Sequence, residues 1–229
     1  MAARRIILLD FDGTACRGDE PARAYAAKIA ATLPGPDGRR LTSVLDGFLD
    51  GTVTGDLLID AHDGYQAVAH LAAAFDVPAE ITQAAFLSVR RRLAEGEITV
   101  DVPDGLIDLL DGLRPNVATV LVTNSPTAGM ADIVHRLGLD RVLDEVVGDA
   151  DKPTGLPPLL DRLLDAIGAQ HEPWRLLSIG DIWANDLRIP RERGAATAYV
   201  DRFDRRQGPA DARAAVIEDL YGYVRTWAS

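Results

Sequence analysis

Five short apolar runs without polar alternation constrain the fold of this chain more than any other feature. The first, Ile6–Leu9, contains only isoleucine and leucine, and a run of this kind is typical of a strand that is buried on both faces. Segments with helical spacing separate the later runs, and this alternation indicates βα units around a parallel sheet. The sequence therefore predicts an α/β fold with five strands, at 6–9, 117–122, 142–147, 176–179 and 196–200.

Helical patterns fill the rest of the chain. In the later part, Ser125-Pro126 can begin a helix that ends at Gly138, and further helices are expected at 104–113, 156–167 and 209–227. Residues 16–100 contain no convincing strand. Their apolar residues recur at steps of three and four, which predicts helices at 22–33, 41–49, 56–75 and 78–95.

The absence of strand patterns between 16 and 100 predicts two domains. One is an α/β core domain of residues 1–15 and 101–229, and the other is an inserted all-helical domain of residues 16–100. In the alternative interpretation, these helices belong to one large α/β domain.

Composition argues against several classes of partner. The chain has 229 residues and a formal net charge of −11, and a polyphosphate would repel such a protein, so we expect no nucleic-acid partner. No stretch approaches the roughly 20 apolar residues that cross a bilayer, so no membrane partner is expected. The single cysteine, Cys16, cannot form an internal disulfide, which is typical of a reducing compartment, and we expect a cytoplasmic protein. The composition indicates no particular oligomeric state.

Two carboxylates, Asp10 and Asp12, directly follow the first predicted strand. Side chains two positions apart point the same way while the backbone is extended, and Gly13 permits a sharp exit from the strand. One carboxylate can attack phosphorus while the other transfers protons, which is the division of labour in covalent phosphoryl transfer. The alternative interpretation is an ordinary Asp-Gly turn.

Three further polar segments follow later strands, where an open α/β sheet binds its ligands. Thr123 lies at a predicted helix start, where a hydroxyl and backbone N–H groups suit a phosphate oxygen. Lys152 can neutralise a transferring phosphoryl group, and Asp181 and Asp186 can hold Mg²⁺ through oxygen ligands. In the alternative interpretation, Ser125, Asp181 or Asp186 only cap helices, and Lys152 is a solvated surface residue.

Together the four segments resemble the loop motifs of the haloacid dehalogenase-like (HAD) hydrolase superfamily. The family's Asp-x-Asp-Gly-Thr motif matches 10–14, its Ser/Thr matches Thr123, its lysine matches Lys152, and its Gly-Asp-x-x-x-Asn-Asp motif matches 180–186. The resemblance implies a doubly wound, Rossmann-like parallel core sheet of five strands. The segment between the first two motifs is much longer than that between the second and third. The similarity therefore implies a helical cap inserted after the first motif.

The resemblance also implies an activity and its site. From this resemblance we expect the protein to be a Mg²⁺-dependent phosphatase that hydrolyses a small phosphorylated metabolite through an aspartyl phosphate. The implied catalytic residues are the nucleophile Asp10 and the general acid–base Asp12. The implied phosphate-binding residues are Thr123, Asn124 and Lys152. The implied Mg²⁺ ligands are Asp10, the backbone carbonyl of Asp12, and Asp181, with supporting positions at Thr14, Asn185 and Asp186.

Members of the family that this sequence resembles also carry out other reactions. Haloacid dehalogenases lack an aspartate that corresponds to Asp12, because a halide leaving group needs no proton, and phosphonate-cleaving members lack it too. Phosphosugar mutases keep both aspartates and remain an alternative, as does a non-catalytic binding or regulatory protein on the same fold.

Overall fold

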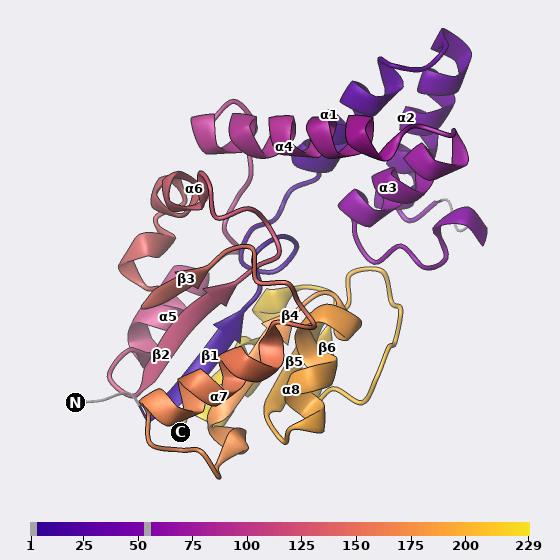
Figure 1. Cartoon of the computed structure of the whole chain (residues 1–229). Helices are drawn as coiled ribbons and strands as arrows, with labels where there is room; N and C mark the ends of the chain where they lie inside the picture. The colour runs from indigo at the N-terminus through magenta and orange to yellow at the C-terminus, as the bar shows by residue number, and fades with distance from the viewer. Residues whose placement is uncertain (1–3, 53–55) are drawn as a thin grey trace. The chain divides into compact units, whose positions relative to one another are not determined.

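The computed structural model describes residues 4–52 and 56–229, and the chain divides into two compact units (Figure 1). Residues up to 17 together with 101–229 form the α/β unit, and residues 18–100 form the helical unit. Within the described residues, no helix combines the length and the apolar composition that a bilayer span requires.

The α/β unit is built on a six-stranded parallel sheet in the order β3-β2-β1-β4-β5-β6. β1 lies in the middle of this sheet because Ile6 to Leu9 are all buried apolar side chains. From β1 the chain moves to β2 and β3, and it then crosses back to place β4 on the other side of β1. The junction between β1 and β4 is therefore the topological switch point, where open α/β sheets bind their ligands. The strands are β1 (Arg5–Leu9), β2 (Val117–Val122), β3 (Glu145–Val147), β4 (Leu176–Gly180), β5 (Ala196–Val200) and β6 (Ala212–Ala214).

Helices cover both faces of this sheet. Leu156, Leu160 and Leu163 recur at steps of three and four along α7, and they share one buried cluster with Ile6 and Leu8 of β1. α7 and α8 lie on one face, the front in Figure 1, and α5 lies behind the sheet, as right-handed crossovers in a sheet of this strand order would place them. The helices are α5 (Leu106–Leu113), α6 (Met130–Arg136), α7 (Leu156–Ala166), α8 (Arg188–Glu192) and α9 (Tyr221–Ala228), with short turns η2 (Leu139–Arg141), η3 (Pro173–Arg175), η4 (Trp183–Leu187) and η5 (Ile217–Leu220).

The helical unit consists of α1 to α4 and one short 3₁₀ turn. Three aromatic rings, those of Tyr25, Tyr65 and Phe86, pack against one another at centroid distances of 5.7–6.3 Å and join α1, α3 and α4. Gly96, with φ of 79°, ends α4 in the left-handed conformation that glycine adopts without strain. The elements are α1 (Glu20–Ala30), α2 (Gly35–Leu49), η1 (Asp56–Leu58), α3 (Gly64–Ala74) and α4 (Ala79–Glu95).

The predicted parallel α/β sheet is confirmed, whereas the count of five strands is wrong. The sixth strand, β6, lies within the segment 209–227 that was expected to be one helix, and only 221–228 of this region is α-helical. β6 has three residues, which is too short for an alternating pattern to be recognised in the sequence. It forms because β5 offers it an open edge, as in the pairing of Ala198 with Ala212.

Two predicted helix starts are also too early, and α2 begins at Gly35, ahead of the predicted start at 41. The helix expected from Ser125 begins at Met130, because Gly129 adopts φ of 79°, which an α-helix does not accommodate. The helix expected at 56–75 is divided, and α3 starts only at Gly64. The Asp63 carboxylate accepts a hydrogen bond from the Gln66 N–H at 2.6 Å and so caps the helix there.

Candidate active site

The carboxyl ends of β1 and β4 bring Asp10 and Asp181 to the switch point of the sheet. Asp10 directly follows β1, and its N–H donates to the Ile179 carbonyl of β4 at 2.9 Å, so its backbone is fixed against the neighbouring strand. Asp181 follows the last residue of β4. Two segments that are remote in sequence therefore meet here, as the predicted position of the site requires.

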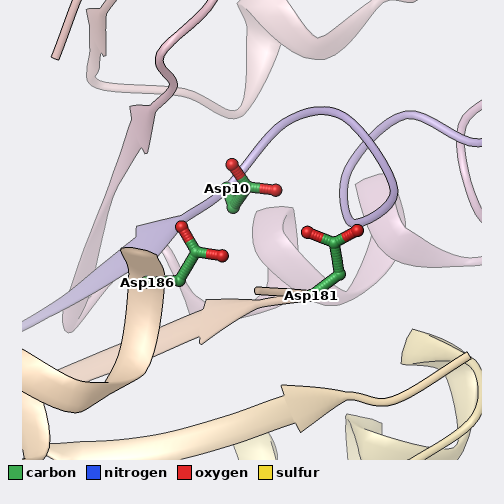
Figure 2. Close-up of side chains that lie close together, drawn as sticks. All are labelled: Asp10, Asp181 and Asp186. Atoms are coloured by element: carbon green, nitrogen blue, oxygen red, sulfur yellow. The ribbon is translucent and has the colours of Figure 1, made fainter. Parts of the chain in front are cut away.

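A third carboxylate, Asp186, joins this pair. One oxygen from each of Asp10, Asp181 and Asp186 lies within 4.8 Å of the other two, and Figure 2 shows the three side chains close together. The π-helical turn η4 carries Asp186, and such turns are frequent at functional sites. The Ile182 N–H donates to Asp186 Oδ2 at 2.9 Å, and the Ser178 hydroxyl donates to the Asp186 carbonyl at 2.7 Å. These two bonds hold η4 against the end of β4.

Two glycines make room for the three carboxylates. A Cβ atom on Gly180 would lie 2.4 Å from the Cβ of Asp186. A Cβ atom on Gly13 would lie 2.2 Å from Oδ2 of Asp181, and Gly13 also has φ of +84°. The glycines of the first and fourth motifs are therefore needed sterically, because any side chain there would displace a site carboxylate.

Lys152 lies at the centre of the acidic group. Its Nζ donates to Asp10 Oδ1 at 2.6 Å, to Asp186 Oδ1 at 2.7 Å and to the Val122 carbonyl at 2.7 Å. The side chain is buried, and these three acceptors use all three N–H groups of an ammonium. In this arrangement Lys152 contributes its charge to the site rather than a free hydrogen-bond donor.

Burial and charge shift the pKa values of both partners. Burial, with a smaller contribution from the neighbouring Asp186 and Asp12, raises the pKa of Asp10 to about 7 against the opposing effect of Lys152. Burial lowers the pKa of Lys152, but the attraction of Asp10 and Asp186 outweighs it, so the pKa of Lys152 lies above its usual value. Lys152 is therefore charged at neutral pH, whereas Asp10 titrates close to it.

The residues present fit a divalent cation. When ionised, the three carboxylates carry three negative charges and Lys152 supplies one positive charge, so these four side chains together carry a net charge of −2. Oδ2 of Asp10 is buried and, among the described residues, has no hydrogen-bond partner. A buried carboxylate oxygen without a donor is unfavourable unless it binds a cation, and oxygen ligands are those that Mg²⁺ prefers.

Asp12 lies outside this carboxylate group. Its Oδ2 accepts a hydrogen bond from the Ser125 hydroxyl at 2.7 Å. Thr14, predicted to support the site, is buried, and its hydroxyl has no hydrogen-bond partner among the described residues. Asn185 lies in η4, where its N–H donates to the Ile182 carbonyl at 3.0 Å.

Two of the three residues predicted to bind phosphate, Thr123 and Asn124, lie in the turn after β2. Thr123 is buried, and its Oγ1 accepts a hydrogen bond from the Ser125 N–H at 3.0 Å. The Asn124 amide forms two hydrogen bonds with the backbone of Lys152, donating to its carbonyl at 2.9 Å and accepting from its N–H at 2.6 Å. Asn124 thus holds the backbone of the segment that carries the lysine.

Sequence reasoning missed the contact that Ser125 makes. The sequence suggested a helix cap for this residue, and no local signal could have identified its partner, because Ser125 and Asp12 are 113 positions apart. Asp186, predicted in a supporting position, is grouped by the structure with Asp10 and Asp181.

No family model matches the sequence, and no curated protein matches it. Solved structures, in contrast, match nearly the whole chain. The HAD-hydrolase YfnB from Bacillus subtilis, described as bound to magnesium, has a TM-score of 0.62 at 19% identity, over 97% of this chain and 99% of its own. A HAD phosphatase from Thermococcus onnurineus has a TM-score of 0.57 at 20% identity, over 98% of each chain.

The L-2-haloacid dehalogenase RSc1362 also matches, with a TM-score of 0.58 at 17% identity, over 98% of this chain and 100% of its own. Identities this low establish a common fold and not a common reaction. The Rossmann-like parallel α/β fold expected from the four sequence motifs is therefore confirmed, and the reaction must be argued from the site.

Proposed function

We propose that this chain, which has the fold of the HAD-like hydrolases, is a Mg²⁺-dependent phosphohydrolase that acts on a small phosphorylated metabolite through an aspartyl phosphate. The observation that carries the proposal is the environment of Asp10. Lys152 holds its Oδ1, its buried Oδ2 has no hydrogen-bond partner in the described chain, and the residue lies in the same acidic group as Asp181 and Asp186.

In the first step, an Asp10 carboxylate oxygen forms a bond to phosphorus while the bond from phosphorus to the leaving oxygen breaks. The Asp12 carboxyl group transfers its proton to that leaving oxygen, so the product departs as an alcohol. In the second step, a water oxygen attacks the same phosphorus and the bond to Asp10 breaks. Asp12 accepts a proton from this water, and both carboxyl groups return to their starting states.

Asp10 must be ionised to attack, and its raised pKa of about 7 opposes this. Lys152 favours the ionised form through its contact with Oδ1, and it offsets part of the charge that develops on the phosphoryl oxygens. Asp10 and Asp181 would hold the Mg²⁺ ion, together with the Asp12 carbonyl, and Asp186 would support them. The bound ion supplies charge stabilisation for the phosphoryl group.

A haloacid dehalogenase is the alternative that the structural matches leave open. Asp12 argues against it, because a departing halide needs no proton and a second carboxylate beside the nucleophile would have no task. On the sequence resemblance we also assign the role of a cap to the helical unit, so that its side chains would select the substrate.

The proposal can be tested by measuring phosphate release from aryl phosphates and from a panel of phosphorylated metabolites. We expect turnover with Mg²⁺, loss of turnover with EDTA, and loss of at least about 10³-fold in kcat for Asp10→Asn. Asp108→Asn, an exposed change on α5, is the matched control and should leave the rate unchanged. Chloride release from 2-chloroacids without phosphate release from any substrate would overturn the proposal, as would full phosphatase activity of Asp10→Asn.

A further inference from the structure

We infer that Ser125 is a positioning residue, which orients the Asp12 carboxyl group for proton transfer. The inference rests on the proposed function, since it assigns to Ser125 a part in the two proton transfers of that reaction. It concerns a side chain whose described contact is with the Asp12 carboxyl group and not with Asp10, Asp181 or Asp186.

The contact itself is short and partly buried. The Ser125 Oγ lies 2.7 Å from Asp12 Oδ2, and Ser125 is 7% exposed, whereas Asp12 is half-buried. A hydroxyl that donates to a carboxylate forms one of the stronger hydrogen bonds in proteins, and partial burial reduces the competition from water. Because Ser125 donates to Oδ2, the other oxygen of Asp12 becomes the preferred carrier of the transferable proton.

The backbone of Ser125 is fixed on both sides of this hydroxyl. Its N–H donates to Oγ1 of Thr123 at 3.0 Å, and its carbonyl accepts from the Asp149 N–H at 2.9 Å. The Asp149 carboxylate in turn accepts from the Thr127 N–H at 2.8 Å. With the main chain held in this way, the Ser125 side chain keeps one main freedom, rotation about its Cα–Cβ bond, and the contact with Asp12 restricts that rotation.

The same three-residue turn connects to the other groups of the site. Thr123 Oγ1 uses an acceptor position for the Ser125 N–H, so its own hydroxyl hydrogen can be donated to a phosphoryl oxygen. The Asn124 amide holds the Lys152 backbone through two hydrogen bonds. Residues 123–125 therefore align three groups with one another, namely the Thr123 hydroxyl that can donate to a phosphoryl oxygen, the Lys152 side chain and the Asp12 carboxyl group.

This role predicts a dependence on the leaving group. A phenol or sugar alcohol needs a proton from Asp12 to depart, whereas dinitrophenol is acidic enough to depart as its anion without one. With phenyl phosphate we expect Ser125→Ala to lower kcat by about 10–100-fold, a part of the 10²–10⁴-fold that general acid–base catalysis contributes. With dinitrophenyl phosphate, formation of the phosphoenzyme should stay within about threefold of the wild-type rate.

The second step supplies an independent readout. Hydrolysis of the aspartyl phosphate needs Asp12 as a base whatever the leaving group was, so Ser125→Ala should release dinitrophenol in a burst and then turn over slowly. Ser125→Thr keeps the hydroxyl and should restore most of the rate with phenyl phosphate. Thr226→Ala, which removes an exposed hydroxyl bonded to the Gly222 carbonyl on α9, is the control for hydroxyl loss away from the site.

Stopped-flow measurement of dinitrophenol release, with steady-state rates for both substrates, decides the matter. A wild-type rate of Ser125→Ala with phenyl phosphate would overturn the inference and leave the phosphatase proposal intact. An equal loss with both substrates and no burst would also overturn it, because a merely structural defect does not depend on the leaving group. If the wild-type protein hydrolyses neither phosphate ester, the proposed function fails first.

Discussion

The buried carboxyl group of Asp10 should make the metal-free protein less stable as the pH rises. Its pKa is raised from 3.8 to about 7 in the folded protein, chiefly because burial disfavours the charged form. A folded-state pKa above the unfolded value contributes stability below pH 4, and this contribution is lost as the pH rises through 7. Since one pKa unit corresponds to about 1.4 kcal/mol, the loss across this window is about 4 kcal/mol.

Urea unfolding of the protein in EDTA, at intervals from pH 4 to pH 8, measures this loss. Asp10→Asn is the reference variant, because its amide can still accept the Lys152 hydrogen bond but does not titrate. The free energy of unfolding of the wild type should fall relative to this variant, at up to about 1.4 kcal/mol per pH unit. Asp108→Asn, on the exposed face of α5, should follow the wild-type curve.

Addition of Mg²⁺ at pH 7.5 should restore the lost stability of the wild type, because the ion binds the folded state only. It should stabilise Asp10→Asn much less, since the amide is a weaker ligand for a hard cation. Parallel pH curves for the wild type and Asp10→Asn in EDTA would refute the reasoning. An equal effect of Mg²⁺ on both proteins would show that the ion binds elsewhere.

Two further predictions follow from the contacts of the site. Lys152→Met should lower the free energy of unfolding at pH 7, measured by urea titration, by about 3–5 kcal/mol, because it leaves two buried carboxylates without their cation. Lys28→Met, at the only other lysine, is the control and should have a much smaller effect in the same titration. Gly180→Ala should displace Asp186 and abolish the thermal stabilisation by Mg²⁺. Gly112 on α5 has open space around it, so Gly112→Ala is the control and should keep that stabilisation. An unchanged Mg²⁺ response of Gly180→Ala would contradict the steric argument.

Much of the sheet could be predicted because its central strands are defined by burial alone. Ile6–Leu9 is apolar throughout and Val117–Val122 is apolar except for Thr119, and short runs of this kind are typical of strands that are buried on both faces. The edge strand β6 could not be predicted, since the sequence Ala212-Arg213-Ala214 is compatible with helix or strand. Its pairing with β5 decides the conformation, and that pairing is a tertiary effect.

The candidate site could be located because its residues follow strands whose carboxyl ends must meet at one edge. The hydrogen bonds inside it could not be foreseen. Whether Asn124 faces a phosphate or the Lys152 backbone depends on how two loops approach each other, and they are 28 positions apart. The contact of Ser125 with Asp12 depends in the same way on the register between β1 and β2, because the two residues follow these strands.

The hydrogen bonds of Asp186 favour a different role for it from that of Asp10, although both lie in one acidic group. Asp186 directs Oδ1 to Lys152 and Oδ2 to the Ile182 N–H, so both of its oxygens already have donors. Asp10 has a donor on Oδ1 only, and its Oδ2 is buried without one among the described residues. A cation therefore gains most from Asp10 Oδ2, and the first effect of Asp186 is to hold Lys152 and the η4 turn in place. Removing the Asp186 carboxylate would take away one of the three acceptors of Lys152 as well as weaken cation binding, so its loss should resemble the loss of Lys152 more than the loss of Asp181.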